Sequence, residues 1–333
     1  MNKLFLFSLL ALSFSLLSCD KDDDKTQANI EEVVVVANRS SGSISFINAE
    51  TDEVIETLTI SGSEPMYVVF VSAKDRIYVG DRAQKQVHVI NPDSRELETS
   101  IPVGEGVFHM WADGQGKQLW VNNDIDNTIS VINLTNHTVT NTINIGVKPH
   151  DVFLTNSGTK AYVTVLIGDE NVRDSVYAFS TSSFEKLASK AVGDDPHLYH
   201  LPSNNRLYVP NQSGTLFVLD ENDLSTIDSV SMAGSHGIYP SPDNKYLFIT
   251  NLPGSQIFSF QTADNTIKGS ALGSDISVPH NITLNKAGSK AFITHSGGSA
   301  NQVTVYNISD GTPTLSKTLT VQNNPFGIAY YQR

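Results

Sequence analysis

The sequence predicts an all-β fold built from seven copies of one four-stranded unit. Three observations predict it: a phrase that recurs at a nearly fixed period, short strands with alternating apolar residues, and chain ends that each carry part of one unit. The phrase is an anchor residue, often proline, then an apolar strand, a polar turn and a second strand similar to Tyr-Val-Thr-Asn. A period of about 40–45 residues with four short strands per unit is typical of propellers, so we expect a closed ring of blades.

The period is measured between the anchors that open each copy. Successive anchors are 42, 42, 47, 39, 44 and 46 residues apart. They are Pro65, Val107, Pro149, Pro196, Ser235, Pro279 and Pro325. We label the four strands of a blade A to D from the axis outward. Strand A follows the anchor, and strand B is the Tyr-Val-Thr-Asn-like strand.

The strands themselves are short, β-branched and bounded by turn residues. The segments Ile44–Ile47, Val87–Ile90 and Ile129–Ile132 alternate in this way and are each followed by asparagine, which favours a turn. In strand A, apolar residues recur at alternate positions, as at Val68 and Phe70. Because blades stack face to face, this stripe is expected to pack between neighbouring blades.

The two ends of the chain complement each other. The repeat region begins with a strand B over residues 33–37 and finishes with an orphan strand A over residues 326–330. Joined, they complete one composite blade and leave no open sheet edge. Six full units and this composite make a seven-bladed β-propeller of four-stranded blades, with one domain over residues 33–333.

The N-terminus predicts export and lipid attachment. Residues 1–18 contain Lys3 and an apolar run over residues 4–17, which is typical of a signal peptide and too short to span a bilayer. The run ends in Leu16-Leu17-Ser18-Cys19, which resembles a bacterial lipobox and implies that Cys19 is diacylated. An ordinary signal peptide with a chance cysteine is the alternative. Since Cys19 is the only cysteine, an intramolecular disulfide and a cysteine-based metal site are both excluded.

Residues 19–32 are polar and mostly acidic, and they are expected to form a solvated tether. The formal net charge of the chain is −13 and no basic patch is present, which argues against nucleic acid as a partner. The same charge argues against electrostatic adhesion to anionic lipid, so the lipid on Cys19 is the expected membrane anchor. We therefore expect an outer-membrane lipoprotein on the periplasmic or the cell-surface face, where an envelope protein could be a partner.

The repeat resembles the YVTN-type β-propeller family over residues 33–330. Its nearest matches to the family motif are AYVT at residues 161–164 and LFITN at residues 247–251. The resemblance implies a mostly extracytoplasmic seven-bladed fold. It specifies function poorly, because the family includes ligand binders and cofactor-handling proteins, with lactonases, lyases and haem d1-binding propellers as relatives. The chain has no Cys-x-x-Cys-His haem attachment motif.

The residue directly after each anchor carries the most distinctive signal. In order along the chain these residues are Met66, Phe108, His150, His197, His236, His280 and Phe326. Four consecutive units thus place histidine at one equivalent position. The start of strand A and the end of strand B open on the same face of a propeller, at the mouth of the channel, where sites usually form.

The ends of the B strands add polar groups at the same face. These positions hold Asn38, Asp81, Asn123, Val165, Asn211, Asn251 and His295. His109 lies one place beyond the first residue after its anchor. The predicted ligand-binding set combines the four channel histidines, His109, Phe108, Phe326 and the polar B-strand ends. In contrast, His88 and His137 fall on outer strands and are expected at the surface.

The histidines allow three interpretations. Each imidazole could pack between blades and hydrogen-bond a carbonyl. Alternatively, His150, His197, His236 and His280 could ligate a transition metal such as zinc or copper, or supply an axial ligand to a tetrapyrrole. In a lactonase or lyase, either His150 or His236 would be the general base.

Because no acid–base or nucleophile pair occurs at a supporting spacing, the sequence favours a binding protein over an enzyme. The predicted function is therefore a lipid-anchored envelope propeller. It would bind a small-molecule or metal ligand at the top of its central channel.

Overall fold

The computed structural model describes residues 30–169 and 171–333. The predicted signal segment (residues 1–18), Cys19 and nearly all of the tether lie outside the described residues. Within them, the chain forms strands throughout, with one short 3₁₀ helix, η1 (Arg39–Ser41). No helix in this part of the chain is long and apolar enough to cross a bilayer.

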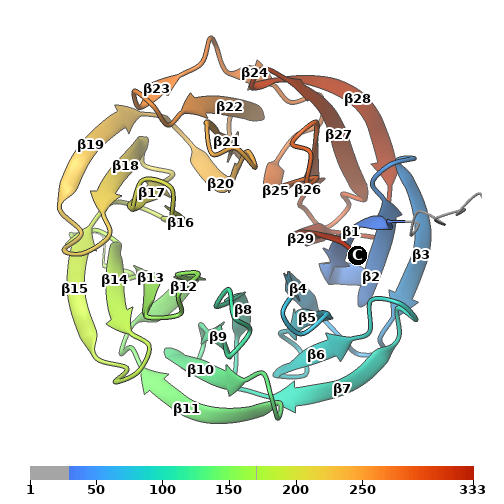
Figure 1. Cartoon of the computed structure of the whole chain (residues 1–333), viewed down its shortest axis with the longest axis horizontal. Helices are drawn as coiled ribbons and strands as arrows, with labels where there is room; N and C mark the ends of the chain where they lie inside the picture. The colour runs from blue at the N-terminus through green and yellow to red at the C-terminus, as the bar shows by residue number, and fades with distance from the viewer. Residues whose placement is uncertain (1–29, 170) are drawn as a thin grey trace, which may run out of the picture. The chain divides into compact units, whose positions relative to one another are not determined.

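Seven antiparallel blades surround a central axis (Figure 1). Blade 1 contains β29 (Pro325–Gln332), β1 (Glu32–Asn38), β2 (Ser43–Asn48) and β3 (Glu53–Thr59). Blade 2 contains β4 (Pro65–Val71), β5 (Arg76–Asp81), β6 (Gln86–Ile90) and β7 (Leu97–Pro102). Blade 3 contains β8 (Val107–Ala112), β9 (Gln118–Asn123), β10 (Thr128–Asn133) and β11 (Thr138–Asn144). Blade 4 contains β12 (Lys148–Leu154), β13 (Lys160–Leu166), β14 (Ser175–Ser180) and β15 (Lys186–Ala191).

The remaining three blades repeat this order. Blade 5 contains β16 (Tyr199–Leu201), β17 (Arg206–Pro210), β18 (Thr215–Asp220) and β19 (Thr226–Ser231). Blade 6 contains β20 (Ser235–Pro240), β21 (Tyr246–Asn251) and β22 (Gln256–Gln261), and its outer strand is split into β23 (Thr266–Ile267) and β24 (Leu272–Gly273). Blade 7 contains β25 (Pro279–Leu284), β26 (Lys290–His295), β27 (Gln302–Ser309) and β28 (Thr312–Thr320). The prediction of an all-β, seven-bladed propeller is confirmed.

The ring closes through a blade made from both ends of the repeat region. The C-terminal strand β29 pairs antiparallel with β1, with Val33 opposite Tyr331 and Val35 opposite Ala329. The buried Tyr331 hydroxyl donates to the carbonyl of Pro92 at 3.1 Å, which ties this blade to blade 2. The predicted composite blade is therefore present, and it leaves β1 without an open edge.

The core is distributed between the blades. Seven apolar clusters each combine side chains of two neighbouring blades. In one of them, Val68 of blade 2 packs with Val33 and Val35 of blade 1. The apolar stripe of strand A is therefore an inter-blade layer, as its alternation predicts.

A β-bulge follows the anchor in strand A. In blade 2, Pro65 pairs with Asp81 and Val68 pairs with Val79, so Met66 and Tyr67 together oppose Gly80 alone. Blades 1, 3, 4, 6 and 7 show the same shift in register. Because a bulge adds one residue and re-aims side chains, two consecutive residues after the anchor can turn toward the axis.

The threonine of the Tyr-Val-Thr-Asn strand supports the next bulge. Thr250 of blade 6 donates to the carbonyl of His280 in blade 7 at 2.6 Å, and Thr294 of blade 7 donates to the carbonyl of Phe326 in blade 1 at 2.9 Å. These hydroxyls satisfy carbonyls that the bulge withdraws from its own ladder. The repeat motif therefore holds the channel residues of the neighbouring blade in place.

Candidate functional site

Six of the seven residues directly after the anchors form a ring of aromatic side chains around the axis, and Met66 is the seventh. The centroid distances between neighbours run 5.0 Å from Phe108 to His150, 4.8 Å to His197, 3.8 Å to His236, 4.8 Å to His280, 4.2 Å to Phe326 and 6.1 Å back to Phe108. Histidines from four adjoining blades thus meet at one rim. All four are buried, so this ring closes the channel where the sequence suggested an open mouth.

The bulge brings a second layer of side chains beneath this ring. Its members are Tyr67, His109, Asp151 and Asn281, each two places after an anchor. The imidazole of His109 lies against the Tyr67 ring, tilted by 30° with centroids 3.4 Å apart, and is 5.1 Å from the ring of His197. His109 therefore joins the axial histidines although it stands one place further along its strand.

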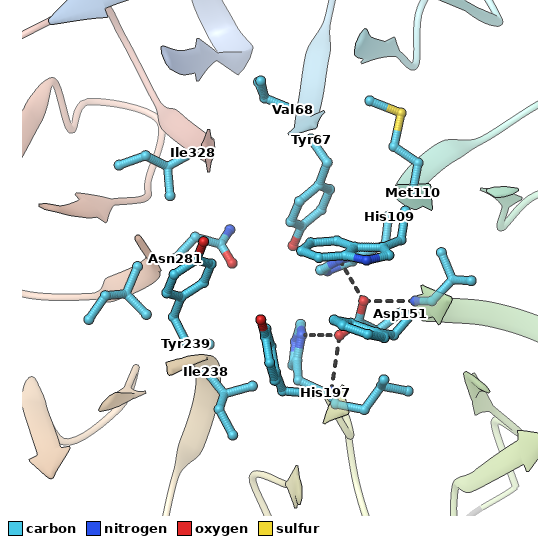
Figure 2. Close-up of a pocket in the computed structure, with 17 residues that line it drawn as sticks. Tyr67, Val68, His109, Met110, Asp151, His197, Ile238, Tyr239, Asn281 and Ile328 are labelled. Atoms are coloured by element: carbon cyan, nitrogen blue, oxygen red, sulfur yellow. Dashed lines mark hydrogen bonds and ion pairs between the residues drawn. The ribbon is translucent and has the colours of Figure 1, made fainter. Parts of the chain in front are cut away.

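Asp151 fixes the orientation of two imidazoles (Figure 2). Its Oδ1 lies 2.9 Å from Nδ1 of His109, and its Oδ2 lies 3.4 Å from Nδ1 of His197. The same carboxylate accepts backbone N–H groups from Val152 and Leu198 at 2.7 and 3.1 Å. When Nδ1 of a neutral imidazole carries the proton, Nε2 holds the lone pair. Asp151 thus sets the Nε2 atoms of His109 and His197 as acceptors.

A second carboxylate contacts the ring from the loop before β16. Asp195 Oδ1 lies 3.0 Å from His150 Nε2, and its Oδ2 lies 3.8 Å from His236 Nε2. The Asp195 backbone N–H donates to Asp174 at 3.1 Å, which holds this loop against the ring. At 30% side-chain exposure, Asp195 is the member of the cluster that reaches solvent.

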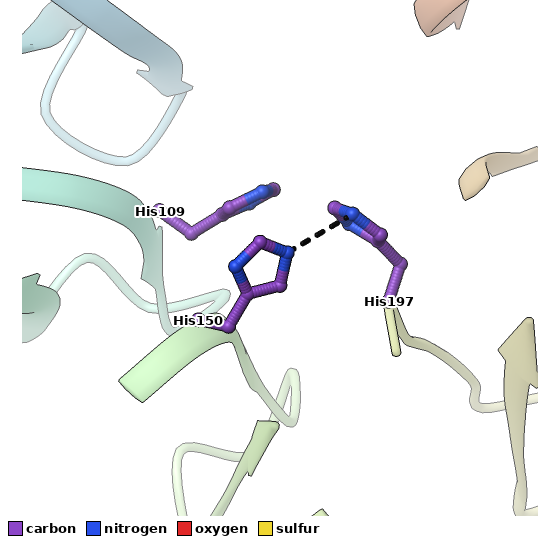
Figure 3. A group of neighbouring side chains, drawn as sticks. All are labelled: His109, His150 and His197. Atoms are coloured by element: carbon purple, nitrogen blue, oxygen red, sulfur yellow. Dashed lines mark hydrogen bonds between the residues drawn. The ribbon is translucent and has the colours of Figure 1, made fainter. Parts of the chain in front are cut away.

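The nitrogen and oxygen atoms are spaced as metal ligands are. Nε2 of His150 lies 3.2 Å from Nε2 of His197 (Figure 3). Two nitrogens at about 2.05 Å from a tetrahedral ion would lie about 3.3 Å apart. Two overlapping groups, His109–His150–His197 and Asp195–His197–His236, each keep their ligand atoms within 4.8 Å of one another. The site could therefore contract around one ion with small side-chain rotations.

Burial keeps three of the histidines neutral. It lowers the pKa of His109 to about 4 and that of His280 to about 3, and it lowers the pKa of His236 well below its usual value. Burial alone would raise the pKa of Asp151, but His109 and His197 hold it well below the usual range. Near neutral pH these three imidazoles are therefore uncharged beside the ionised Asp151, and both are protonation states that metal binding requires.

The structure brings three of the four histidines that were predicted as metal ligands close to other ligand-type side chains. His150, His197 and His236 lie within the two groups, whereas His280 lies in neither and has its Nδ1 2.8 Å from the Asn281 amide. His109 and Asp195 complete the groups instead. Asp151 and Asp195 were not singled out in the sequence, although each lies next to a channel histidine or its anchor. The β-bulge that turns Asp151 toward the axis cannot be recognised from the types of residue that form it.

The polar side chains at the ends of the B strands form hydrogen bonds inside the sheets. In six of the seven blades the anchor pairs with the end of strand B, so both lie at the same rim, as expected. Asn38, Asn123 and His295 bond to hydroxyls of strand C, and Asn211 and Asn251 bond to carbonyls preceding strand A. All of these residues are buried, and none lies in the histidine groups.

Asp81 also bonds inside its own blade, and its partner His88 does not lie where the sequence predicts. It lies 2.9 Å from Nε2 of His88, whose Nδ1 lies 2.9 Å from Ser100 Oγ. His88 was expected at the surface, and that prediction is wrong because its side chain is only 1% exposed. The pair forms a polar core within blade 2, since a buried imidazole needs partners on both nitrogens.

Fold and site together define the chain as a seven-bladed β-propeller whose channel is closed by histidines and carboxylates.

No family model matches the sequence, and no curated protein matches it. Solved structures share the fold. A Desulfotomaculum acetoxidans protein of unknown function is 14% identical with a TM-score of 0.76, covering 90% of this chain and 98% of that one. A Bacteroides fragilis candidate 6-phosphogluconolactonase is 18% identical with a TM-score of 0.72, covering 93% and 100%. The dihydro-haem d1 dehydrogenase NirN, solved with DHE, is 12% identical with a TM-score of 0.64, covering 89% and 74%.

Proposed function

We propose that this protein binds one transition-metal ion on the propeller axis and serves as a metal-binding protein of the bacterial envelope. His109, His150 and His197 would be the ligands, with Asp195 and His236 beside them. The observation that carries the proposal is the convergence of three imidazoles from blades 3, 4 and 5 within 4.8 Å. Asp151, which orients two of them, occupies the outer position that carboxylates commonly take around metal-bound histidines.

The donor set indicates the class of ion. Imidazole nitrogens with one carboxylate suit zinc, copper and nickel, whereas magnesium and calcium prefer oxygen ligands. A tetrapyrrole is less well supported, because the cavity directly beneath the ring is about 80 Å³. Pockets for drug-sized ligands span about 300–1,000 Å³.

Binding is favoured over sugar-phosphate hydrolysis. Among the described residues, no lysine or arginine lines the cavity beneath the ring, while Asp151 does and Asp195 lies nearby. A phosphorylated substrate would meet negative charge without a compensating cation. A lactonase-type or lyase-type reaction on an uncharged substrate is the second candidate, because the Asp151–His109 pair has the form of an oriented general base.

The location is part of the same proposal. The resemblance of residues 16–19 to a lipobox and the acidic segment after them support attachment to the outer membrane through Cys19. An axial metal site on a tethered propeller would then face the periplasm or the cell exterior.

The test is metal titration of the full mature chain after chelator treatment. Copper, zinc and nickel are added separately, with stoichiometry from elemental analysis and affinity from calorimetry. We expect one tightly bound ion per chain for at least one of these metals, and loss of that binding in His197→Gln. The matched control is His295→Gln, because His295 is also buried but lies within blade 7, bonded to Thr304. Absence of stoichiometric binding, or full binding by His197→Gln, would refute the proposal.

A further inference from the structure

A cavity of about 80 Å³ lies directly beneath the histidine ring. Tyr67, His109, Asp151, His197 and Asn281 form its polar side (Figure 2). Its remaining walls are mainly apolar and include Val68, Trp111, Ile238, Tyr239 and Ile328. Its volume corresponds to about two to three water molecules at liquid density. The cavity thus contacts two of the proposed metal ligands from inside the channel.

The cavity communicates with the opposite end of the channel. A second cavity of about 220 Å³ lies further along the axis and shares Val68, Trp111, Tyr239 and Ile328 with the first. Along strand A, ring residues such as His236 are buried, whereas Ile238 and Tyr239 below them are partly exposed. Solvent therefore reaches the underside of the ring through the channel end that lies away from the histidines.

Two polar atoms facing this cavity lack partners. Nε2 of His109 and the hydroxyl of Tyr67 are buried and make no hydrogen bond of ordinary length and angle within the described part of the chain, with the Asn281 side chain lying near the Tyr67 hydroxyl. His109 is 8% exposed and Tyr67 is 7% exposed. Because buried polar groups in proteins are nearly always paired, both atoms point to a ligand that the protein itself does not supply. A metal ion would satisfy His109 but would leave the Tyr67 hydroxyl free to donate.

We propose that this cavity binds a small neutral molecule at an open coordination position of the metal, with the Tyr67 hydroxyl as hydrogen-bond donor. This inference rests on the proposed metal site. The volume limits the molecule to about two to four non-hydrogen atoms. Neutrality follows from the lining, since the described residues that line the cavity include the carboxyl group of Asp151 but no lysine or arginine. The molecule reaches the metal from the far end of the channel, past Ile328.

The test uses copper(I)-loaded protein and alkyl isocyanides, which are neutral ligands of copper(I) with a distinctive infrared stretch. Methyl isocyanide has three non-hydrogen atoms and should bind, whereas tert-butyl isocyanide has six and should bind at least tenfold more weakly. Azide, a small anion, should also bind poorly to the copper(II)-loaded protein. Equal binding of both isocyanides would mean that the open position faces solvent, and absence of isocyanide binding would mean that the cavity does not serve the metal. Either result overturns the inference.

Two variants test the route by which the molecule enters the cavity and the hydroxyl group that donates a hydrogen bond to it. Ile328→Phe narrows the channel between the two cavities and should slow methyl isocyanide binding at least tenfold, with the copper content unchanged. Ile227→Phe, on the exposed face of β19, is the matched control and should bind as the parent does. Tyr67→Phe should shift the infrared stretch, because it removes the hydroxyl that contacts the bound molecule. A parent-like rate in Ile328→Phe, or a parent-like stretch in Tyr67→Phe, would overturn the inference.

Copper loading is measured first on the same samples, which separates the two proposals. Protein that takes up no copper contradicts the proposed function, and this inference falls with it. Protein that loads copper and then excludes methyl isocyanide contradicts only the cavity site. Circular dichroism of each variant establishes that the propeller is folded before binding is compared.

Discussion

The Oδ1 of Asp151 lies 2.9 Å from Nδ1 of His109, while its Oδ2 lies 3.4 Å from Nδ1 of His197. One carboxylate from blade 4 thus connects imidazoles of blades 3 and 5. It sets the same tautomer in both and directs both Nε2 lone pairs toward the axis. The carboxylate therefore gives two imidazoles a defined tautomer with a free nitrogen lone pair. Packing of aromatic side chains alone would not fix either property.

Replacing Asp151 should weaken metal binding without removing a ligand. In Asp151→Asn, the amide oxygen can accept only weakly and the imidazole tautomers are no longer fixed, so the affinity should fall about 10- to 100-fold. Competition with a chromophoric chelator measures this change. Asp81→Asn is the control, because Asp81 makes an equivalent buried pair with His88 outside the channel. Its affinity should stay within twofold of the parent, and a fall as large as that of Asp151→Asn would show that the effect is general destabilisation.

The metal-free protein should lose stability in mild acid. Burial lowers the pKa of His280 to about 3, whereas an unfolded histidine titrates near 6.5. The unfolded state therefore binds more protons between these values, and the free energy of unfolding falls as the pH drops below about 6.5. Urea denaturation at several pH values measures the slope. His280→Gln should show a shallower slope between pH 6.5 and pH 4, and an unchanged slope would assign the acid sensitivity to other groups.

Closure of the composite blade should depend on Tyr331. This side chain is 1% exposed, packs between blades 1 and 2, and donates to Pro92. Tyr331→Ala should cost about 3–5 kcal/mol of unfolding free energy, as truncation of a large buried aromatic residue does. Urea denaturation with a fluorescence readout measures the change. Tyr331→Phe keeps the ring and loses only the hydrogen bond, so a cost of about 1 kcal/mol is expected.

Membrane attachment should depend on Cys19. In Cys19→Ser the thiol proposed to carry the lipid is absent, so the protein should move from the membrane fraction to the soluble fraction of the cell envelope. Fractionation with immunodetection and mass spectrometry of the N-terminus measure both outcomes. A membrane-bound Cys19→Ser protein would instead support an uncleaved signal segment as the anchor.

The sequence by itself determined the architecture. The spacing of the anchors, the alternation of residues such as Val68 and Phe70, and the complementary chain ends predict seven blades and their closure, and the structure has both. These features are readable because each blade is a local unit whose strands pair with their neighbours in sequence. The ring of His150, His197, His236 and His280 followed from the same periodicity, since equivalent positions of a closed repeat meet at the axis.

Only the tertiary structure decided which groups form the site. The bulge turns His109 and Asp151 into the channel, and the loop before β16 brings Asp195 against His150. The polar B-strand ends at the same rim bond within the sheets, and His88 is buried beside Asp81. Residue type and period give the blade and the rim on which a side chain stands. Its direction depends on an extra residue in the ladder and on partners from neighbouring blades, and those are fixed only when the ring closes.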